Sequence, residues 1–323
     1  MPRNIRDRRD PNNRVVHVTN RTWEGLPFVP NRTIRRMVKG ILARAQNMSP
    51  VTICLFLFMG NHYHMIMAGD ANRVSLYLAY VDAEIARRMM RFFPGRWGPK
   101  FWAGRFKEQL LATPQDVINK IAYICCNPMR ANLVSNLSEY PGASSIASLK
   151  VPDHKTADLC SFTFPKYFKP LKTNRLSRSA DIDLSKELQE HSSGHFSLET
   201  DLFAWTKCFK EKVNKESALQ YINATIAIAE KEATARGVIG ADALMFQPFD
   251  REHTPERKGE TPYVECSDKE LRKILIKDYQ QFRALCAEAR RLTRLGLHAE
   301  WPRGAFVPAR LWSSLVPIPI PLG

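Results

Sequence analysis

Two apolar, β-rich runs separated by a short turn constrain the fold of this chain more than any other feature of its sequence. Residues 51–59 form a continuous apolar run, Gly60 and Asn61 are typical turn residues, and residues 62–68 form a second β-rich run. The pattern predicts two adjacent antiparallel strands. The first run is about half the length of a membrane-spanning helix, so we expect no transmembrane segment.

Further strand and helix patterns flank this hairpin. β-Branched residues mark strands, and apolar residues at helical spacing mark helices. The expected elements are a strand at residues 14–22, a helix at 31–46, a helix at 73–93, a strand at 101–111 and a helix that opens at Thr113 and Pro114. The order β, α, β, β, α, β predicts an α+β fold of the ferredoxin-like split βαβ type, an antiparallel sheet with helices on one face.

The character of the sequence changes after Ser145. A polar, mixed stretch is followed by two helical patterns, at residues 202–236 and 267–297, and then by a tail that carries five prolines. A gap rich in proline and charge separates the two helices, at residues 247–261. We therefore expect a first domain at residues 1–150, a polar linker at 151–200, and a helical accessory region with an extended Pro-rich tail at 201–323.

Charge and cysteine content indicate the kind of partner and compartment. The chain has 48 Lys and Arg against 32 Asp and Glu, a formal net charge of +16. Such an excess favours a polyanionic partner, although a solvated basic surface with no partner would have the same composition. The seven cysteines show no CxxC spacing, and the first residues carry no apolar secretory segment. Both features predict a cytoplasmic protein with reduced thiols.

Two histidines on the second strand of the hairpin are candidates for binding a metal ion. Alternate residues of a strand face the same way, so His62 and His64 project from one face about 6.6 Å apart, whereas Tyr63, Met65 and Met67 point to the other. Two imidazoles on one face can chelate one ion. Ordinary polar residues on a half-exposed strand would give the same pattern.

The helix that opens at Thr113 places a tyrosine on its polar side. Thr113 is a plausible N-cap, Pro114 suits the first helical position, and Asp116 favours the positive helix end. The apolar side consists of Val117, Ile118, Ile121, Ile124 and Cys125, and the polar stripe of Asp116, Lys120, Tyr123 and Asn127. Asn127 lies one turn beyond Tyr123, so its oxygen could reach an ion near the phenol. A surface tyrosine without a role fits the same geometry.

These motifs, in this order, resemble those of the REP-associated tyrosine transposases, which belong to the Y1 HUH group of IS200/IS605-like transposases. Asn61-His62-Tyr63-His64 is similar to the His-hydrophobic-His motif of that family. The stretches 123–134 and 140–145 resemble its Y1 region, and His17-Val-Thr-Asn-Arg21 and Gly104-Arg-Phe106 are also similar. The resemblance covers residues 14–145 and does not extend to the C-terminal region.

The resemblance implies a metal-dependent enzyme that cuts and rejoins single-stranded or hairpin DNA, such as a palindromic REP element. It implies no membrane partner. It implies that His62, His64 and Asn127 ligate Mg²⁺ or Mn²⁺, and that Tyr123 attacks the DNA to form a 5′-phosphotyrosine intermediate, acting as a monomer or homodimer. Asn132 departs from the family, which usually has glycine there. Asparagine also tolerates the left-handed conformation, so the turn is expected to survive.

Basic and aromatic residues near these motifs are candidates for DNA contacts. The basic ones are Arg14, Arg21, Arg35, Arg36, Lys100, Arg105 and Lys120. Lysine on a polar helix face is usually solvated, so Lys120 is a weak candidate for stabilising a phenolate. Four neighbouring aromatic residues could stack unpaired bases or could simply belong to the core, namely Trp23, Trp97, Phe101 and Trp102.

Two other functions remain open. A domesticated DNA- or RNA-binding regulator would keep the fold and charge without catalysis, although it would have no need of all four candidate site residues. A metal-dependent phosphodiester hydrolase would use the two histidines with water as the nucleophile. Only the transesterase forms a covalent protein–DNA adduct, which separates it from both alternatives.

Overall fold

The computed structural model describes residues 14–25, 31–95, 97–164, 192–245 and 262–305. The chain divides into two compact units, one of residues 12–267 and one that combines residues 1–11 with 268–323. In the second unit the described element is α7 (Lys269–Arg294), close to the helix expected at 267–297. None of the helices in the described ranges has the length and apolar character needed to cross a bilayer.

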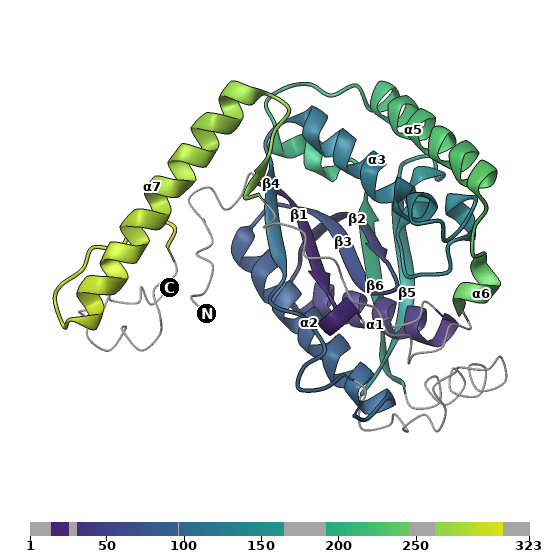
Figure 1. Cartoon of the computed structure of the whole chain (residues 1–323), viewed down its shortest axis with the longest axis horizontal. Helices are drawn as coiled ribbons and strands as arrows, with labels where there is room; N and C mark the ends of the chain where they lie inside the picture. The colour runs from purple at the N-terminus through teal and green to yellow at the C-terminus, as the bar shows by residue number, and fades with distance from the viewer. Residues whose placement is uncertain (1–13, 26–30, 96, 165–191, 246–261, 306–323) are drawn as a thin grey trace. The chain divides into compact units, whose positions relative to one another are not determined.

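A five-stranded sheet forms the centre of the larger unit (Figure 1). Its strands are β1 (Val15–Arg21), β2 (Thr52–Phe58), β3 (His62–Ala68), β4 (Lys107–Leu111) and β7 (Val264–Glu265), in the order β2-β3-β1-β4-β7. The first four strands pair antiparallel, and α1 (Arg32–Met48) and α2 (Ala71–Phe92) connect them. This connectivity confirms the predicted α+β fold and its ferredoxin-like order.

Two details of the sheet differ from the sequence prediction. The fourth strand begins at Lys107 rather than at residue 101, because the preceding segment bends and buries Phe101 and Trp102 in the core. The short strand β7, which was not predicted, pairs parallel with β4 at the sheet edge. Two residues carry too weak a periodic signal to identify a strand from sequence.

Helices cover both faces of the sheet (Figure 1). Along β3, Tyr63, Met65 and Met67 point into the core beneath α1 and α2, as the alternation predicted. Ile66 and Ala68 point into a second core, which contains α3 (Pro114–Arg130) and α5 (Lys215–Arg236). The ferredoxin-like pair of helices thus lies on one face, and the appended α3 lies on the opposite face.

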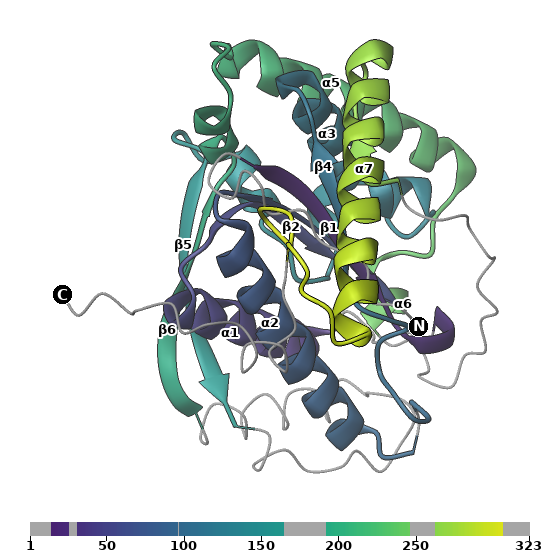
Figure 2. The same ribbon diagram turned by 90° about the vertical axis from the view of Figure 1, so that its left-hand side faces the viewer.

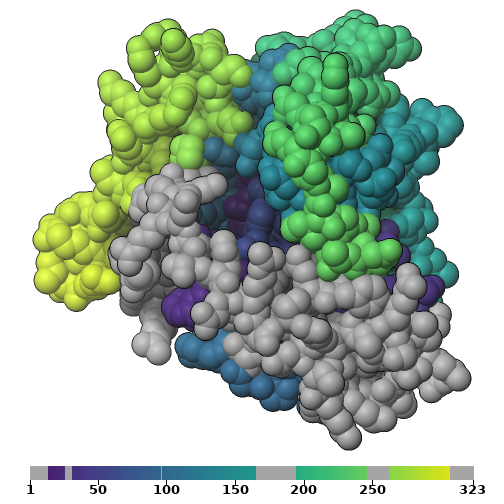
Figure 3. All heavy atoms as spheres, turned by 45° about the vertical axis from the view of Figure 1, so that its right-hand side comes forward, coloured from purple at the N-terminus to yellow at the C-terminus, as the bar shows by residue number. Residues whose placement is uncertain are grey.

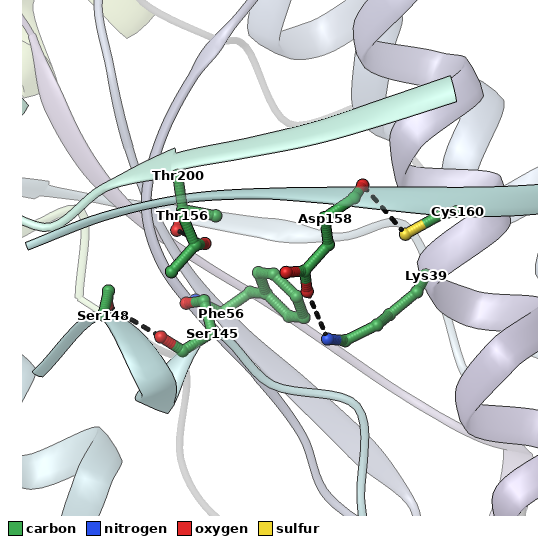
Figure 4. A network of polar contacts seen from close by, with 8 residues as sticks. All are labelled: Lys39, Phe56, Ser145, Ser148, Thr156, Asp158, Cys160 and Thr200. Atoms are coloured by element: carbon green, nitrogen blue, oxygen red, sulfur yellow. Dashed lines mark hydrogen bonds and ion pairs between the residues drawn. The ribbon is translucent and has the colours of Figure 1, made fainter. Parts of the chain in front are cut away.

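The stretch expected to be a polar linker contains a long hairpin. The strands β5 (Lys155–Thr163) and β6 (Ser192–Asp201) pair antiparallel and lie beside α1 (Figure 2). Lys39 of α1 forms an ion pair of 2.7 Å with Asp158, and the Thr156 and Thr200 hydroxyls are 2.7 Å apart across the hairpin (Figure 4). The functional division at residues 150 and 200 stays a prediction.

The Tyr140–Ser145 motif attaches the chain to the outer edge of β2. The Tyr140 hydroxyl donates to the Phe58 carbonyl at 3.0 Å, and the Ser145 hydroxyl accepts from the Phe56 amide at 2.9 Å. Ser148 donates to the Ser145 carbonyl at 2.7 Å (Figure 4). These bonds satisfy backbone groups that an uncovered edge strand would leave unpaired, so the motif is structural here.

The C-terminal part of the larger unit is helical, as expected, but its main helix begins later. Residues 204–208 form a 3-10 turn, and α5 starts only after Asn214, whose side chain caps the Ser217 amide at 3.1 Å. Figure 3 shows α5 and the short α6 (Ala241–Met245) on the surface. Asn132 has φ 54°, which confirms that asparagine supplies the left-handed turn after α3. Residues 247–261 and most of the proline-rich tail lie outside the described residues.

The close packing of α1 against β5 makes a testable demand on Gly40. A Cβ atom at this position would lie 2.0 Å from the backbone oxygen of Ser161. The backbone of β5 would have to shift to make room for it. We predict that Gly40→Ala lowers the free energy of unfolding by about 1–3 kcal/mol, measured by urea denaturation.

Gly104→Ala is the matched control, because no atom lies within 4 Å of the position that its Cβ would take and its φ is not in the left-handed region. Equal stability of the two variants would contradict the described contact between α1 and the hairpin.

Candidate active site

His62 and His64 lie on the face of β3 that is turned away from α1 and α2. Their ring centroids are 4.9 Å apart with an interplanar angle of 85°. His64 is buried, with 7% of its surface exposed, whereas His62 is partly exposed and lies opposite Arg21 of β1. The structure therefore brings both imidazoles to one place, with one ring near solvent.

Tyr123 reaches the same place from α3. Thr113 and Asp116 form a reciprocal capping box at the start of this helix, with Pro114 in its first turn, as the sequence predicted. The residues of the predicted apolar side are all buried in the second core. Tyr123 lies edge-on to His64, with ring centroids 6.0 Å apart, and its side chain is 42% exposed. The phenol is thus beside an imidazole and still accessible to a substrate.

Two residues that sequence analysis did not single out as site residues, His17 and Gln109, adjoin the histidine pair. The rings of His17, on β1, and His64 are nearly parallel with centroids 5.2 Å apart, and His17 Nε2 lies 2.9 Å from His64 Nδ1. Gln109 of β4 is His17's Cα partner across the sheet, and its Oε1 lies 3.4 Å from His17 Nδ1. The alternation of β1 puts His17 on one face, but only the strand register reveals its neighbours.

Burial keeps the inner histidines neutral. Desolvation lowers the pKa of His17 from 6.5 to about 3, with a further contribution from the nearby charge of Lys120. Desolvation also lowers the pKa of His64 well below its ordinary value, with further electrostatic contributions from His62 and Lys120. A neutral imidazole keeps a lone pair, which a metal ligand requires.

The polar stripe of α3 faces protein rather than solvent over its first two turns. Asp116 accepts from the Ser267 amide at 2.7 Å and from its hydroxyl, and Lys120 forms an ion pair with Glu265. Lys120 is only 8% exposed and lies 4.9 Å from the Tyr123 ring centroid. The expectation that Lys120 is solvated was therefore wrong, because β7, which supplies Glu265, was not foreseen.

The candidate ligands for a divalent ion are two imidazoles and one side-chain amide. In the described ranges no group of three or more His, Cys, Asp or Glu side chains is arranged for metal binding. Beyond the two imidazoles, the remaining candidate is Asn127, whose buried amide nitrogen makes no hydrogen bond. Rotation of that amide would present its oxygen instead. Two nitrogen donors and an amide oxygen suit Mn²⁺ better than Mg²⁺, which prefers oxygen.

The candidate DNA-binding residues fall into separate groups. Arg21 and Arg105 are exposed, as is Lys100, whose Nζ lies 4.0 Å from the Trp23 ring centroid. Arg14 is buried and donates to the Tyr263 hydroxyl at 3.2 Å. The exposed residues Arg35 and Arg36 belong to α1, on the sheet face opposite the histidines.

Of the four aromatic candidates for base stacking, only Trp23 is not buried. Trp97, Phe101 and Trp102 are 1%, 1% and 8% exposed and belong to the core under α2. Trp23 is partly exposed and follows Arg21 by two residues. Its neighbour Thr22 is tied to Asn61, next to His62, by a backbone bond of 2.8 Å. One partly exposed indole ring therefore follows a residue that is hydrogen-bonded to the start of the histidine strand.

Comparison with known proteins gives little beyond this geometry. No protein-family model matches the chain, and no curated protein matches it. Among solved structures, the chain is similar to one described as a REP-associated tyrosine transposase bound to a REP hairpin. The identity is 17%, over 42% of this chain and 78% of that chain, with a TM-score of 0.34. Similarity this low does not establish an activity, so the function has to follow from this chain's own residues.

The low pKa of His17 predicts an acid-sensitive fold in the metal-free protein. Below about pH 6.5 the unfolded chain protonates this side chain, whereas the folded chain does so only near pH 3, so the free energy of unfolding decreases as pH falls. The loss from one such group is about 2 kcal/mol by pH 5. Urea denaturation with a chelator should show a smaller decrease from pH 7 to 5 for His17→Gln than for the wild type. Identical decreases would contradict the neutral, buried state of His17.

The ion pair between Lys120 and Glu265 predicts strong coupling. Glu265→Gln leaves the buried Lys120 charge unpaired and should lower the free energy of unfolding by about 1–3 kcal/mol. Lys120→Met removes that charge, so adding Glu265→Gln to it should cost much less. A urea-denaturation double-mutant cycle measures the coupling. Additive effects would mean that the two side chains do not interact.

Proposed function

We propose that this protein is a metal-dependent transesterase that cuts and rejoins single-stranded DNA through Tyr123, as a tyrosine transposase does. The observation that carries the proposal is the position of the Tyr123 ring, 6.0 Å from the His64 ring and beside the His62–His64 pair. An accessible phenol next to two imidazoles supplies a nucleophile and a cation site in one place.

In this proposal Tyr123 exchanges one phosphodiester bond for another. The Tyr123 hydroxyl gives up its proton and its oxygen attacks the phosphorus of a phosphodiester. The bond to the 3′ oxygen breaks, that oxygen takes up a proton, and a 5′-phosphotyrosyl protein and a free 3′-OH result. Attack by another 3′-OH on the phosphotyrosine reverses the step and releases the phenol. One phosphodiester replaces another, so joining strands needs no ATP.

His62, His64 and Asn127 would hold the ion, Mn²⁺ or Mg²⁺. When bound, it would neutralise charge that develops on the scissile phosphate. His64 is suited to this role because burial keeps it neutral and a hydrogen bond to His17 orients its ring. His62, which is partly exposed, is accessible from the solvent side.

Single-stranded or hairpin DNA fits the surface next to the site. Arg21 lies opposite His62, and Lys100 covers one face of Trp23. Exposed cations beside an aromatic ring suit phosphates and an unpaired base, which a duplex does not expose. The similar solved structure is described as bound to a hairpin, but the choice of substrate proposed here does not depend on that similarity.

The direct test is capture of a covalent adduct with a single-stranded hairpin oligonucleotide in Mn²⁺. Tyr123→Phe should abolish the adduct and leave the gel-shift affinity for the hairpin nearly unchanged, because only the attacking oxygen is lost. Tyr221→Phe is the matched control, since this tyrosine on α5 is similarly exposed, at 48%. His62→Ala should also lose cleavage and keep binding.

The outcomes also separate the alternatives. Cleavage without any adduct would indicate a metal-dependent hydrolase, and binding without cleavage would indicate a regulator. An adduct that persists in Tyr123→Phe would mean that another residue is the nucleophile.

A further inference from the structure

The geometry points to Gln109 and His17 as positioning residues that fix the tautomer of His64, so that its Nε2 carries the lone pair offered to a cation. The cation-binding role of His64 rests on the proposed function. The inference concerns a chain of three buried side chains from three adjacent strands, β4, β1 and β3, and the last of them, His64, lies beside Tyr123.

Hydrogen-bond chemistry sets the direction of this chain. The Gln109 Oε1 can only accept, so His17 donates from Nδ1 across 3.4 Å. A neutral His17 then has its lone pair on Nε2, which must accept from Nδ1–H of His64 at 2.9 Å. A neutral His64 with a proton on Nδ1 has its lone pair on Nε2.

Burial makes this direction matter. Gln109, His17 and His64 are 6%, 5% and 7% exposed, so water competes little for their polar atoms. If the Gln109 amide were reversed, its NH₂ group would donate to Nδ1 of His17. Each imidazole would then adopt its other tautomer, and His64 would carry its N–H at Nε2. An N–H cannot bind a cation. The orientation of one glutamine amide therefore decides whether His64 is a ligand or a hydrogen-bond donor.

Substitutions of Gln109 separate these two cases. Glutamate can only accept when ionised, so Gln109→Glu preserves the direction of the chain, whereas Gln109→Met is similar in length and removes the acceptor. We expect Gln109→Met to weaken Mn²⁺ binding by about 10- to 100-fold and Gln109→Glu to retain or tighten it. Free Mn²⁺ measured by electron paramagnetic resonance, without DNA, gives the affinity. Glu108→Gln is the control, because the next side chain along β4 points to the other face of the sheet.

A second readout needs neither metal nor activity. Long-range ¹H–¹⁵N spectra of protein labelled in its histidine rings report which nitrogen of His64 carries the proton. The expected result is a proton on Nδ1 in the wild type and in Gln109→Glu, and a mixture of tautomers in Gln109→Met. A proton on Nε2 in the wild type would overturn the inference, as would unchanged tautomer and Mn²⁺ affinity in Gln109→Met.

This readout also keeps the inference apart from the proposed function. A protein with the expected His64 tautomer that forms no DNA adduct would refute the transesterase and leave the hydrogen-bonded chain intact. Adduct formation with the opposite tautomer would refute the chain alone.

Discussion

The packing of α3 across one face of the sheet is the contact on which the other features of the site depend. It buries a face that carries imidazoles as well as aliphatic side chains, so His17 and His64 lose their hydration and remain neutral. The start of the helix is held in place because the Asp116 carboxylate accepts hydrogen bonds from the backbone amides of its cap residue, Thr113, and of Ser267. Its accessible Tyr123 is thereby fixed beside a desolvated His64.

The two faces of the sheet differ in the side chains that they carry. Beneath α1 and α2 the core is aromatic and aliphatic, and the hydroxyl of its buried Tyr63 donates to Asp82 at 3.0 Å. The other face combines an apolar core under α3 and α5 with the histidine cluster. The segment that contains Glu265 and Ser267 contributes to this face from late in the sequence. The chain beyond residue 150 is thus part of the scaffold around Tyr123, not only an appendage.

Local sequence patterns predicted most of the helices and strands. Contacts between residues far apart in the sequence could not be predicted in this way. Alternation placed His62 and His64 together, and helical spacing with a cap placed Tyr123 on α3, because both depend on neighbouring residues. The partners of these residues depend on register between distant strands. Gln109 meets His17 across 92 positions, and Glu265 meets Lys120 through a strand of two residues. Buried aromatics such as Trp97 could not be told from stacking platforms without the fold.

We propose that a cation held by His62 and His64 lies within a phosphate's width of the Tyr123 oxygen. A crystal structure with Mn²⁺, located by its anomalous scattering, would show this arrangement. We expect one Mn²⁺ bound to both imidazoles, through Nε2 in His64, with the phenol oxygen close enough for one phosphate to contact both. An ion bound elsewhere, or a phenol turned away from it in every copy of the chain, would rule the arrangement out.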